Sequence, residues 1–516
     1  MNHSLTNRET SHSPSRMTGT ACLISCAIAF GTALGASGAT ASETERLMQL
    51  LVQKGILSAE EAEIIRAEAA QERQAELQET EIKKRELVGT GLGYEPTMPA
   101  RDDKPSIQTF PFAVQSADGK DIFRIRGRLQ MDAGWQDFGS GIPDVARQGS
   151  DFPDYGVIFR RLRLGALGVF KEKWEWQLEV DYAENEVDLA NAYIAYLMPH
   201  GRLAAGHFKE PFTMEYATSS RYITFMERSA AVDAYKVDRQ PGIMYETIRP
   251  TWYGALGVFG SGIEINRDVE EGWSVGGRLS FAPYLQGTDF IHIGAGFNYR
   301  ENAENQSVSD IGSNGRYDGE VYKYPDLRLR TREGTRIIDA RLIGRDDLNA
   351  IRDFTRYGLE FAAGMGSWWM QSEYVRIDLD IDTDELALIL SPSNRTDKSS
   401  LTQDGWYIQT GYFLTGESKP YRAFSGDYGR LRPIRNFSTA DGSIGAVEIA
   451  FRYSVADSLE HTRIGRGQKL ETWTAGLNWY LNPEVLIRAN VIYLEGERDI
   501  YKDDGWVYAF RLQYLF

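Results

Sequence analysis

The sequence predicts an all-β fold, a transmembrane antiparallel β-barrel of about sixteen strands with a short N-terminal α-helical segment. From about residue 121 to the end, segments of roughly ten residues alternate apolar with polar side chains, and turn or charged stretches separate them. Aromatic residues gather at the ends of these segments, as they do at the interfaces of a membrane-spanning barrel. No apolar run of about 18 residues follows the N-terminal leader, which excludes spanning helices. Strands in lipid must close on themselves, because lipid offers no partner to an open sheet edge.

Residues 1–41 are interpreted as a secretory signal peptide. Arg16 precedes a stretch of apolar and small residues that ends in A-T-A, which predicts cleavage after Ala41. A membrane anchor is the first alternative, although Gly and Thr interrupt a short apolar run. Lipidation at Cys26 is the second, because "LISC" resembles a lipoprotein box. Cys22 and Cys26 are the two cysteines of the chain, so cleavage would leave no disulfide or thiol chemistry.

Residues 42–88 are predicted to form a periplasmic helical segment. Ser58 and Glu61 have the S-x-x-E spacing of a capping box, and apolar residues near helical spacing surround it. A short oligomerising coiled coil and a solvated spacer helix both fit this pattern, and we favour the coiled coil. Residues 89–120 are rich in Gly and Pro and are predicted to be a linker, which leaves 121–516 for the barrel.

The last segment, "WVYAFRLQYLF", shows the alternation most clearly. From Trp506 to Phe516 every second residue is apolar or aromatic, whereas Arg511 and Gln513 lie at the alternate positions. One face therefore suits lipid and the other suits a wet interior. Four aromatic pairs predict the girdles at the two membrane interfaces. They are Trp252-Tyr253, Trp368-Trp369, Trp406-Tyr407 and Trp479-Tyr480.

Seventeen segments qualify as candidate strands. They start near residues 121, 157, 173, 187, 201, 241, 251, 271, 290, 335, 354, 367, 404, 444, 469, 484 and 505. The weakest is 335–345, "TRIIDARLIGR", because it lies inside a long loop-like region. Single-chain bacterial barrels have an even number of strands, so its removal leaves sixteen. A barrel of that size encloses an aqueous channel rather than a filled core.

Arginine recurs at every second position of "FRIRGRLQ", although the chain carries a formal net charge of -16. If Phe123 and Ile125 face lipid, then Arg124, Arg126 and Arg128 face the lumen. The opposite register would place three arginines in lipid, at roughly 2–4 kcal/mol each near the midplane. The sequence therefore predicts a locally basic lumen in an acidic protein.

Two further segments add inward arginines. In "FRRLRLGALGVF", Arg161 and Arg163 share the inward phase, and Arg160 needs a β-bulge or a place near the rim. A third group lies in "LRLRTREGTR" and consists of Arg328, Arg330, Arg332 and Arg336. Guanidinium groups offer forked donors to anionic oxygens, which favours a path for anions. The alternative is that these arginines pair with lumen carboxylates and hold a plug or loop.

Other motifs give no second chemistry. The acidic composition argues against a nucleic acid partner, which needs a basic footprint. "DLDIDTDE" resembles the start of a calcium loop but has Thr383 where the sharp-turn glycine belongs. The six histidines are scattered, and common hydrolase, zinc-protease and P-loop motifs do not occur. We expect no catalytic site, no metal and no cofactor.

The chain resembles the phosphate-selective porin O/P family of Gram-negative outer membranes. The resemblance rests on "IRGRLQMDAGWQDF", "FRRLRLGALGVFKEKWEWQLEVDYAE", "LAAGHFKEPFTMEYATSSRYITFMERSAA", "YIQTGYFLTGESKPY", "GAVEIAFRYS" and "GLNWYLNPEVLIRANVIYL". These blocks follow the family's order over nearly all of 121–516. The resemblance implies a homotrimer in a lipid and lipopolysaccharide membrane, and an inward constriction loop near 209–238. It also implies passive diffusion of small anions, with phosphate as a candidate.

The family's phosphate site is a ladder of arginines with a few lysines. By motif, the resemblance assigns ladder positions to Arg128, Arg160, Arg161, Arg228, Arg328, Arg330 and Arg336. With the lumen register, the predicted anion-binding set also includes Arg126 and Arg163. Tyr216 stands where the family has a lysine before A-T-S-S, which leaves anion preference expected and phosphate specificity open. The remaining function class is a structural or adhesion barrel, or a barrel enzyme, whose pore is incidental.

Overall fold

The computed structural model describes the barrel part of the chain. The described residues are 54, 106–108, 112–146, 152–183, 186–262, 272–302, 324, 327, 329–332, 334–338, 340–343, 350–384, 399–458, 467–498 and 501–516. The chain divides into two units, Met1–Lys83 and Lys84–Phe516, and the barrel belongs to the second. The predicted signal peptide, the predicted helix over 42–88 apart from Lys54, and Arg328 lie outside the described residues.

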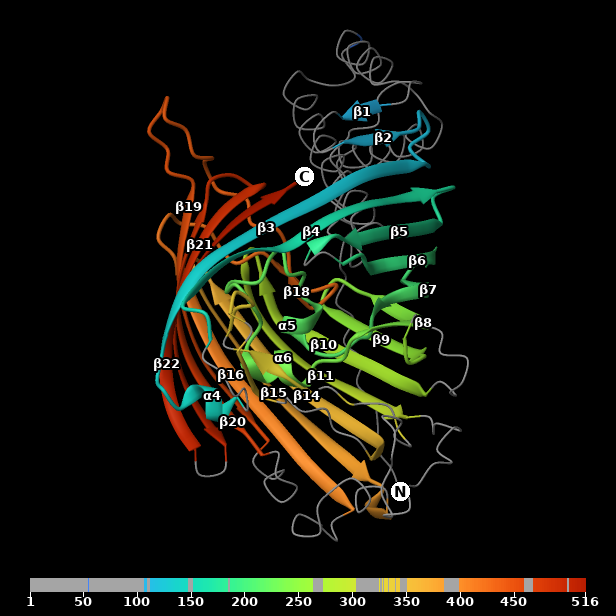
Figure 1. Ribbon diagram of the computed structural model, residues 1–516. Helices are drawn as coiled ribbons and strands as arrows, with labels where there is room; N and C mark the ends of the chain where they lie inside the picture. Colours follow the sequence, from blue (N-terminus) through green and yellow to red (C-terminus); the bar gives the residue numbers. More distant parts are fainter. Residues whose placement is uncertain are drawn as a thin grey trace, which may run out of the picture. The chain divides into compact units, whose positions relative to one another are not determined.

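Sixteen antiparallel strands close into a barrel within the described residues (Figure 1). They are β3 (Ile122–Phe138), β4 (Tyr155–Phe170), β5 (Trp174–Asp181), β6 (Asp188–Met198), β7 (Gly201–Lys209), β8 (Arg239–Ile248), β9 (Trp252–Phe259), β10 (Trp273–Gln286), β11 (Asp289–Glu301), β14 (Ile351–Met365), β15 (Trp368–Ile381), β16 (Ser400–Phe413), β19 (Ala446–Asp457), β20 (Lys469–Tyr480), β21 (Val485–Arg498) and β22 (Tyr501–Leu515). Each pairs with the next along the chain, and β22 pairs with β3 to close the ring. The predicted barrel of sixteen strands is confirmed.

The remaining elements are short. They are β1 (Ser106–Gln108), β2 (Ala113–Gln115), β12 (Thr331–Arg332), β13 (Arg341–Ile343), β17 (Tyr421–Arg422), β18 (Asp427–Tyr428), α4 (Ile142–Val145), α5 (Met214–Ala217) and α6 (Ala230–Tyr235). The candidate strand at 335–345 contributes only β13, which pairs with β12 outside the barrel sheet. Part of the predicted linker forms β2, which pairs with the start of β3. No described helix is long and apolar enough to cross a membrane.

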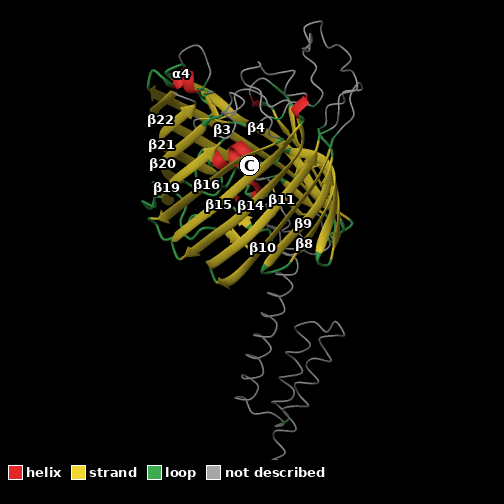
Figure 2. Ribbon diagram, turned by 90° about the horizontal axis from the view of Figure 1, so that it is seen from below, coloured by secondary structure: helices red, strands yellow, loops and turns green. Residues whose placement is uncertain are grey.

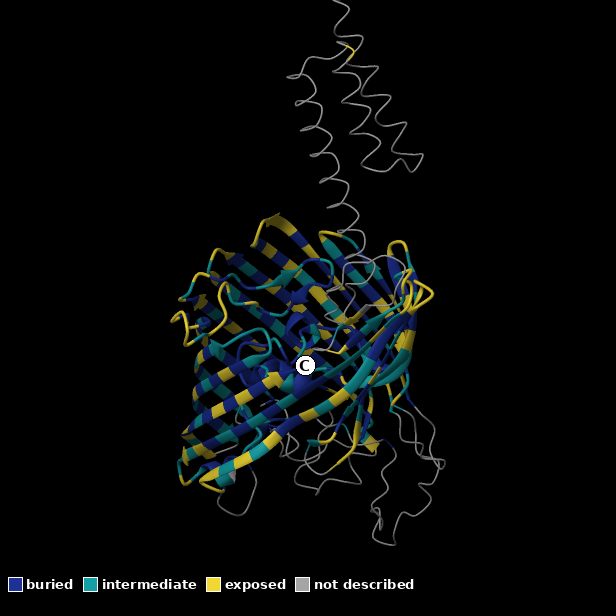
Figure 3. Cartoon of the chain, turned by 90° about the horizontal axis from the view of Figure 1, so that it is seen from above, coloured by how far each residue is buried: buried dark blue, intermediate teal, exposed yellow. Residues whose placement is uncertain are grey.

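Burial alternates along the strands as the sequence predicts (Figure 3). In β3, Arg128, Gln130 and Asp132 are buried, whereas Phe123 is 38% exposed on the other face. The arginines therefore point into the barrel. Gln130 pairs with Arg161 and Met131 with Phe159, so one extra residue is inserted in β4. This β-bulge turns both Arg160 and Arg161 inward, as the phase of the sequence requires.

One aromatic belt crosses six neighbouring strands on the outer face. Its rings, with centroids 4.9–6.4 Å apart, are Trp406, Tyr453, Trp473, Tyr493, Trp506, Tyr508 and Trp135. The four predicted pairs need a correction, because Tyr253, Trp369 and Tyr407 are buried on the inner face. Neighbouring residues of a strand point to opposite faces, so one member of each pair cannot join a girdle.

The last residue completes the seam between β22 and β3. The amide of Gly127 donates to the carbonyl of Phe516 at 2.7 Å, and the amide of Phe516 donates back at 3.2 Å. The Phe516 ring covers Gly127, where a Cβ atom would lie 2.0 Å from a ring carbon. A glycine in an outward strand position thus receives an aromatic cover from the neighbouring strand.

The segment 210–238, here called the constriction loop, runs inside the barrel and contains α5 and α6 (Figures 1 and 2). Seven of its backbone carbonyls between Ser220 and Glu227 accept hydrogen bonds from side chains of the wall. The donors are Gln130, Arg452, Asn478, Arg488, Arg511 and Gln513. Buried backbone groups away from water need such partners, so these side chains of the wall hold the loop in place.

Glu227 is the ionic anchor of the constriction loop. Its carboxylate accepts from Arg160 Nε at 2.9 Å, Arg161 Nη2 at 3.1 Å and Arg511 Nη2 at 2.9 Å. Burial by itself raises the pKa of Glu227, but the three guanidinium groups lower the pKa well below its usual range. The loop is therefore tied to β4 and to β22 at one point.

A second inward segment, 414–445, contains β17 and β18 and meets the constriction loop. Lys419 Nζ lies 2.5 Å from Thr224 Oγ1 and 3.1 Å from Glu448. The amide of Tyr428 donates to Thr218 Oγ1 at 3.3 Å. This inward turn is not predictable from the sequence, because its residues carry no periodic pattern.

We expect Phe516→Ala to lower the fraction of folded barrel, because the ring no longer covers Gly127. Burial of a phenyl ring contributes roughly 1.5–3 kcal/mol. The measurement is the heat-modifiable band on detergent gels after refolding. Phe516→Tyr keeps the ring and is expected to assemble normally. Equal assembly of the alanine and tyrosine variants would contradict this role.

We expect Glu227→Gln to release the constriction loop while the barrel still assembles. Removal of one partner from a buried ion pair costs roughly 3–5 kcal/mol, because the guanidinium groups stay buried. Limited proteolysis in detergent should cut the variant within 210–238 faster than the unmodified protein. Glu172→Gln, in an exposed turn, is the matched control. Loop cleavage at the control rate would show that Glu227 is not the anchor.

The effect of pH on the Glu227 anchor follows from the direction of its pKa shift. A carboxylate with a lowered pKa stabilises the loop above the usual glutamate range and loses this effect only as pH falls through the lowered value. Glu227→Gln should therefore still be cleaved within 210–238 faster than the unmodified protein at about pH 4, as at neutral pH. Equal cleavage of the two proteins at about pH 4 would contradict the lowered pKa.

Candidate anion-binding constriction

Two cavities lie inside the barrel and meet at the constriction loop. Cavity A has a volume of about 180 Å³ and cavity B about 340 Å³. They share Arg163, Lys209, Ser220 and Arg239. These four residues define the constriction.

The cavities follow one another along the barrel axis. On β5, Glu179 borders cavity A and Asp181, two residues further, borders cavity B. On the antiparallel β4, Arg163 borders both cavities and Arg161 borders cavity B alone. A solute that passes the barrel on this side therefore meets cavity B, the constriction and cavity A in sequence.

Positive charge is in excess in both cavities. Cavity A is lined by nine cationic side chains and four carboxylates: Arg126, Arg128, Arg163, Arg202, Lys209, Arg221, Arg239, Arg278 and Arg422 against Glu179, Glu210, Glu246 and Asp427. Cavity B is lined by eight and six: Arg160, Arg161, Arg163, Lys209, Arg228, Lys236, Arg239 and Arg336 against Asp181, Glu186, Asp188, Glu227, Asp233 and Asp238. The lumen is basic although the chain has a net charge of -16.

Glu179 is shared by four guanidinium groups. Arg126 donates to its Oε2, and Arg128, Arg163 and Arg221 lie 3.6, 3.8 and 3.6 Å away. One carboxylate cannot neutralise four cations, so this part of cavity A keeps a positive charge.

Arg221 brings an unpartnered hydrogen-bond donor to cavity A. The residue is only 9% exposed, its Nη2 forms the ion pair with Glu179 at 3.6 Å, and its Nε is buried without a hydrogen-bond partner among the described residues. Burial lowers the pKa of Arg221 to about 10, so the group is still charged at neutral pH. A buried donor that lacks a partner indicates a place for an unseen acceptor.

Tyr216 lies between two cations that have no carboxylate partner in the described residues. Lys209 Nζ is 4.7 Å from the centre of the Tyr216 ring, and the guanidinium carbon of Arg228 is 5.5 Å away. Lys209 donates to the Tyr216 carbonyl at 2.6 Å, and Arg228 donates to the carbonyls of Glu215 and Thr218, both at 3.0 Å. Burial raises the pKa of Tyr216, so its hydroxyl stays neutral. The ring supports both cations by cation–π contact in place of the family's lysine.

Arg239 is the third cation of this kind. It is the register partner of Lys209, where the chain leaves the wall at the end of β7 and rejoins it at the start of β8. Its Nε atom is buried without a hydrogen-bond partner in the described part of the chain. Two positive side chains therefore stand at the base of the constriction loop.

The structure brings most of the predicted site residues together. Arg126 and Arg128 border cavity A, Arg163 borders both cavities, and Arg160, Arg161, Arg228 and Arg336 border cavity B. Arg330 borders neither cavity, and Arg328 lies outside the described residues. Anion binding at these residues stays a prediction.

Several predicted arginines also have structural partners. Arg160 and Arg161 hold Glu227, and Arg163 Nε lies 2.6 Å from Asp181. The alternative interpretation, in which arginines pair with lumen carboxylates and hold a loop, therefore describes part of what these three residues do.

Seven cations that line the cavities were not among the residues predicted from the sequence. They are Arg202, Lys209, Arg221, Lys236, Arg239, Arg278 and Arg422. Arg202 and Arg278 have the inward phase of their strands, which could have identified them. Arg221 lies in a segment without strand periodicity, and nothing local marks it. No cluster of three potential metal ligands exists among the described residues.

Comparison with known proteins gives the family. The profile described as "Phosphate-selective porin O and P" matches residues 123–516. Porin O of Pseudomonas aeruginosa is 26% identical over 445 residues, which cover 78% of this chain and 90% of Porin O. An uncharacterized protein of Caulobacter vibrioides is 27% identical over 393 residues, covering 74% of this chain and 70% of that protein. Among solved structures, an anion-selective porin from Comamonas acidovorans aligns at 10% identity and a TM-score of 0.46, covering 77% of this chain and 100% of that chain.

The family profile spans the whole barrel, from the first arginine strand to the terminal phenylalanine. Porins are channels, which confirms the expectation that the protein is not an enzyme. The chain belongs to the phosphate-selective porin O and P family of outer-membrane porins.

Proposed function

We propose that the protein is a passive diffusion channel for small anions. The observation that carries the proposal is the set of three cations at and beside the constriction, Lys209, Arg228 and Arg239, that have no carboxylate partner among the described residues. A cation whose donors are met by carbonyls is not neutralised by a carboxylate. Such charges act at close range, whereas loop carboxylates are screened beyond about 8–10 Å at ordinary salt.

An anion passes through the channel only if its attraction to the lumen is favourable and also weak enough for release. The arginines around Glu179 and Glu227 share their charge with these carboxylates, which moderates the attraction for an anion. Several adjacent sites of moderate strength let a solute enter and leave. The serine hydroxyl of Ser220 and the cations of the constriction can replace part of the hydration shell.

We propose phosphate as the physiological anion, as the family resemblance implies. Forked guanidinium donors suit its oxygens. The neutral Tyr216 contributes no charge where the family has a lysine, so we expect phosphate to block chloride current less strongly here than in members that keep it.

We further propose a homotrimer in the outer membrane, with segment 42–88 in the periplasm. The family resemblance supports the assembly, and cross-linking in detergent tests it. The second candidate function is a non-selective or structural barrel. A sealed planar bilayer separates the two, because a structural barrel gives no stable anion-selective conductance.

We expect the double variant Lys209→Gln/Arg239→Gln to lose most of the anion preference. One unit charge near the path contributes about 1 kcal/mol with water-like screening, or roughly a fivefold change in permeability ratio. The measurement is the reversal potential in a potassium chloride gradient. The control is Arg352→Gln, whose side chain is 58% exposed and pairs with Asp353. Cation preference in the unmodified channel, or no shift in the double variant, would refute the proposed role.

A further inference from the structure

The inner wall of the barrel is apolar on one side. A buried cluster on β6–β9 consists of Ala195, Ala204, Phe208, Met244, Tyr253, Ala255 and Phe259, with Tyr193 packed against it. We call it the apolar wall. The residues between its members point outward and are exposed: Ile194, Leu203, Ile243, Tyr245, Leu256 and Val258. The apolar wall therefore faces the lumen, where porin-type barrels usually carry polar side chains.

Five of these residues border cavity A. They are Tyr193, Ala204, Phe208, Met244 and Tyr253. The Phe208 ring is fixed by edge-to-face contacts with Tyr193 at 5.7 Å and Phe259 at 5.9 Å between centroids. Such contacts hold the ring in place without filling the cavity.

The polar groups on the side of the apolar wall already have hydrogen-bond partners. Glu246 accepts from Arg202 and from the hydroxyl of Tyr253. The Tyr193 hydroxyl donates to Glu175 at 3.1 Å. The guanidinium carbons of Arg202 and Arg278 lie 5.6 Å from the centres of the Tyr193 and Tyr253 rings and cover them. What remains for a solute on this side of cavity A is the Phe208 ring and the Met244 side chain.

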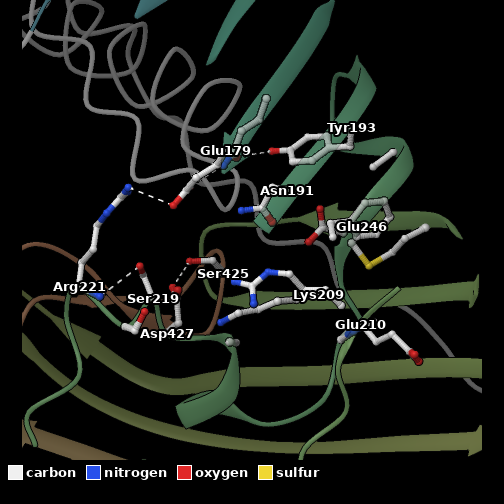
Figure 4. Close-up of a pocket in the computed structure, with 18 of the residues that line it drawn as sticks. Glu179, Asn191, Tyr193, Lys209, Glu210, Ser219, Arg221, Glu246, Ser425 and Asp427 are labelled. Carbon is white, nitrogen blue, oxygen red and sulfur yellow. Dashed lines mark hydrogen bonds and ion pairs between the residues drawn. The ribbon is translucent and has the colours of Figure 1, made fainter. Parts of the chain in front are cut away.

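The other side of cavity A is cationic. Figure 4 shows Arg221 and Ser219 on one side, Tyr193 and Glu246 on the other, and Lys209 between them. Arg221 forms an ion pair with Glu179 through Nη2 at 3.6 Å, and its Nε donor lacks a hydrogen-bond partner among the described residues. Cavity A thus has a cationic end at Arg221 and Lys209 and an apolar end at Phe208 and Met244.

We propose that cavity A binds small aromatic anions, each with one ring and one carboxylate or sulfonate group, on their way through the channel. The inference rests on the proposed anion channel and names a substrate class for it. The anionic group contacts Arg221 and Lys209, and the ring lies on Phe208 and Met244. The volume of about 180 Å³ suits one ring, since a cavity of about 150 Å³ holds benzene. Inorganic anions use only the charged end.

The test compares benzenesulfonate with methanesulfonate as blockers of chloride current through the full-length protein in planar bilayers. Both stay ionised across the usable pH range, and they differ in the ring. We expect benzenesulfonate to block at about fivefold lower concentration, because about 40 Å² of apolar surface leaves water. Benzyl alcohol, which has the ring without the charge, should not block.

Two variants test which end of cavity A contributes to block by the sulfonates. Met244→Gln keeps the volume and makes the wall polar, so the advantage of benzenesulfonate should fall to about twofold or less while methanesulfonate is unchanged. Arg221→Gln should weaken both blockers. Met365→Gln is the matched control, since this methionine is 67% exposed at the end of β14. Ala204→Ser, which adds one oxygen to the same wall, replaces Met244→Gln if the latter does not assemble.

The outcomes separate the two proposals. An anion-selective channel that is blocked equally by both sulfonates would overturn the aromatic site and leave the proposed function intact. An unchanged advantage in the wall variants would also overturn it. A channel without anion preference would refute the proposed function itself.

Discussion

The contact between Glu227 and the guanidinium groups of Arg160, Arg161 and Arg511 is the interaction on which the interior depends. A sixteen-stranded barrel is wide enough to hold water, and a loop folded into it has no core of its own to pack on. The loop is held because Glu227 ties it to β4 and β22 and because side chains of the wall donate hydrogen bonds to its carbonyls.

The way the loop is held also explains why an acidic protein has a basic lumen. A carbonyl satisfies a guanidinium donor without cancelling its charge, whereas a carboxylate does both. Arg488 donates to the carbonyls of Ile223 and Phe225, and Arg228 donates to carbonyls of the same loop. Structural hydrogen bonds to backbone thus leave positive charge inside the barrel. The residues that fix the loop and the residues proposed to attract an anion overlap for this physical reason.

The sequence predicted the wall of the barrel better than its contents. Alternation with period two located the strands, because lipid and water impose different side chains on the two faces. It also left Arg160 out of phase, which predicted a bulge or a place near the rim, and the even number of strands in such barrels excluded 335–345. The cations at the base of the constriction loop were not predictable in this way. Lys209 and Arg239 are separated along the chain by the whole constriction loop, and only the pairing of β7 with β8 joins them. Arg221 lies in a segment without periodicity, and the signal peptide and the helix over 42–88 stay predictions.

The apolar wall shows the limit of the alternation argument. In β9, "WYGALGVF", both faces are apolar, so the pattern does not tell which face meets lipid. Only the position of the strand in the closed ring makes Tyr253 a lumen residue and Leu256 an outer one. The opposite side of the lumen is formed by the arginine, asparagine and glutamine side chains that hold the loop. In cavity A, the cations Arg221 and Lys209 line the same space as the apolar side chains of Phe208 and Met244. With the proposed aromatic-anion site, discrimination among anions depends on how each distributes its charge and its apolar surface as well as on net charge.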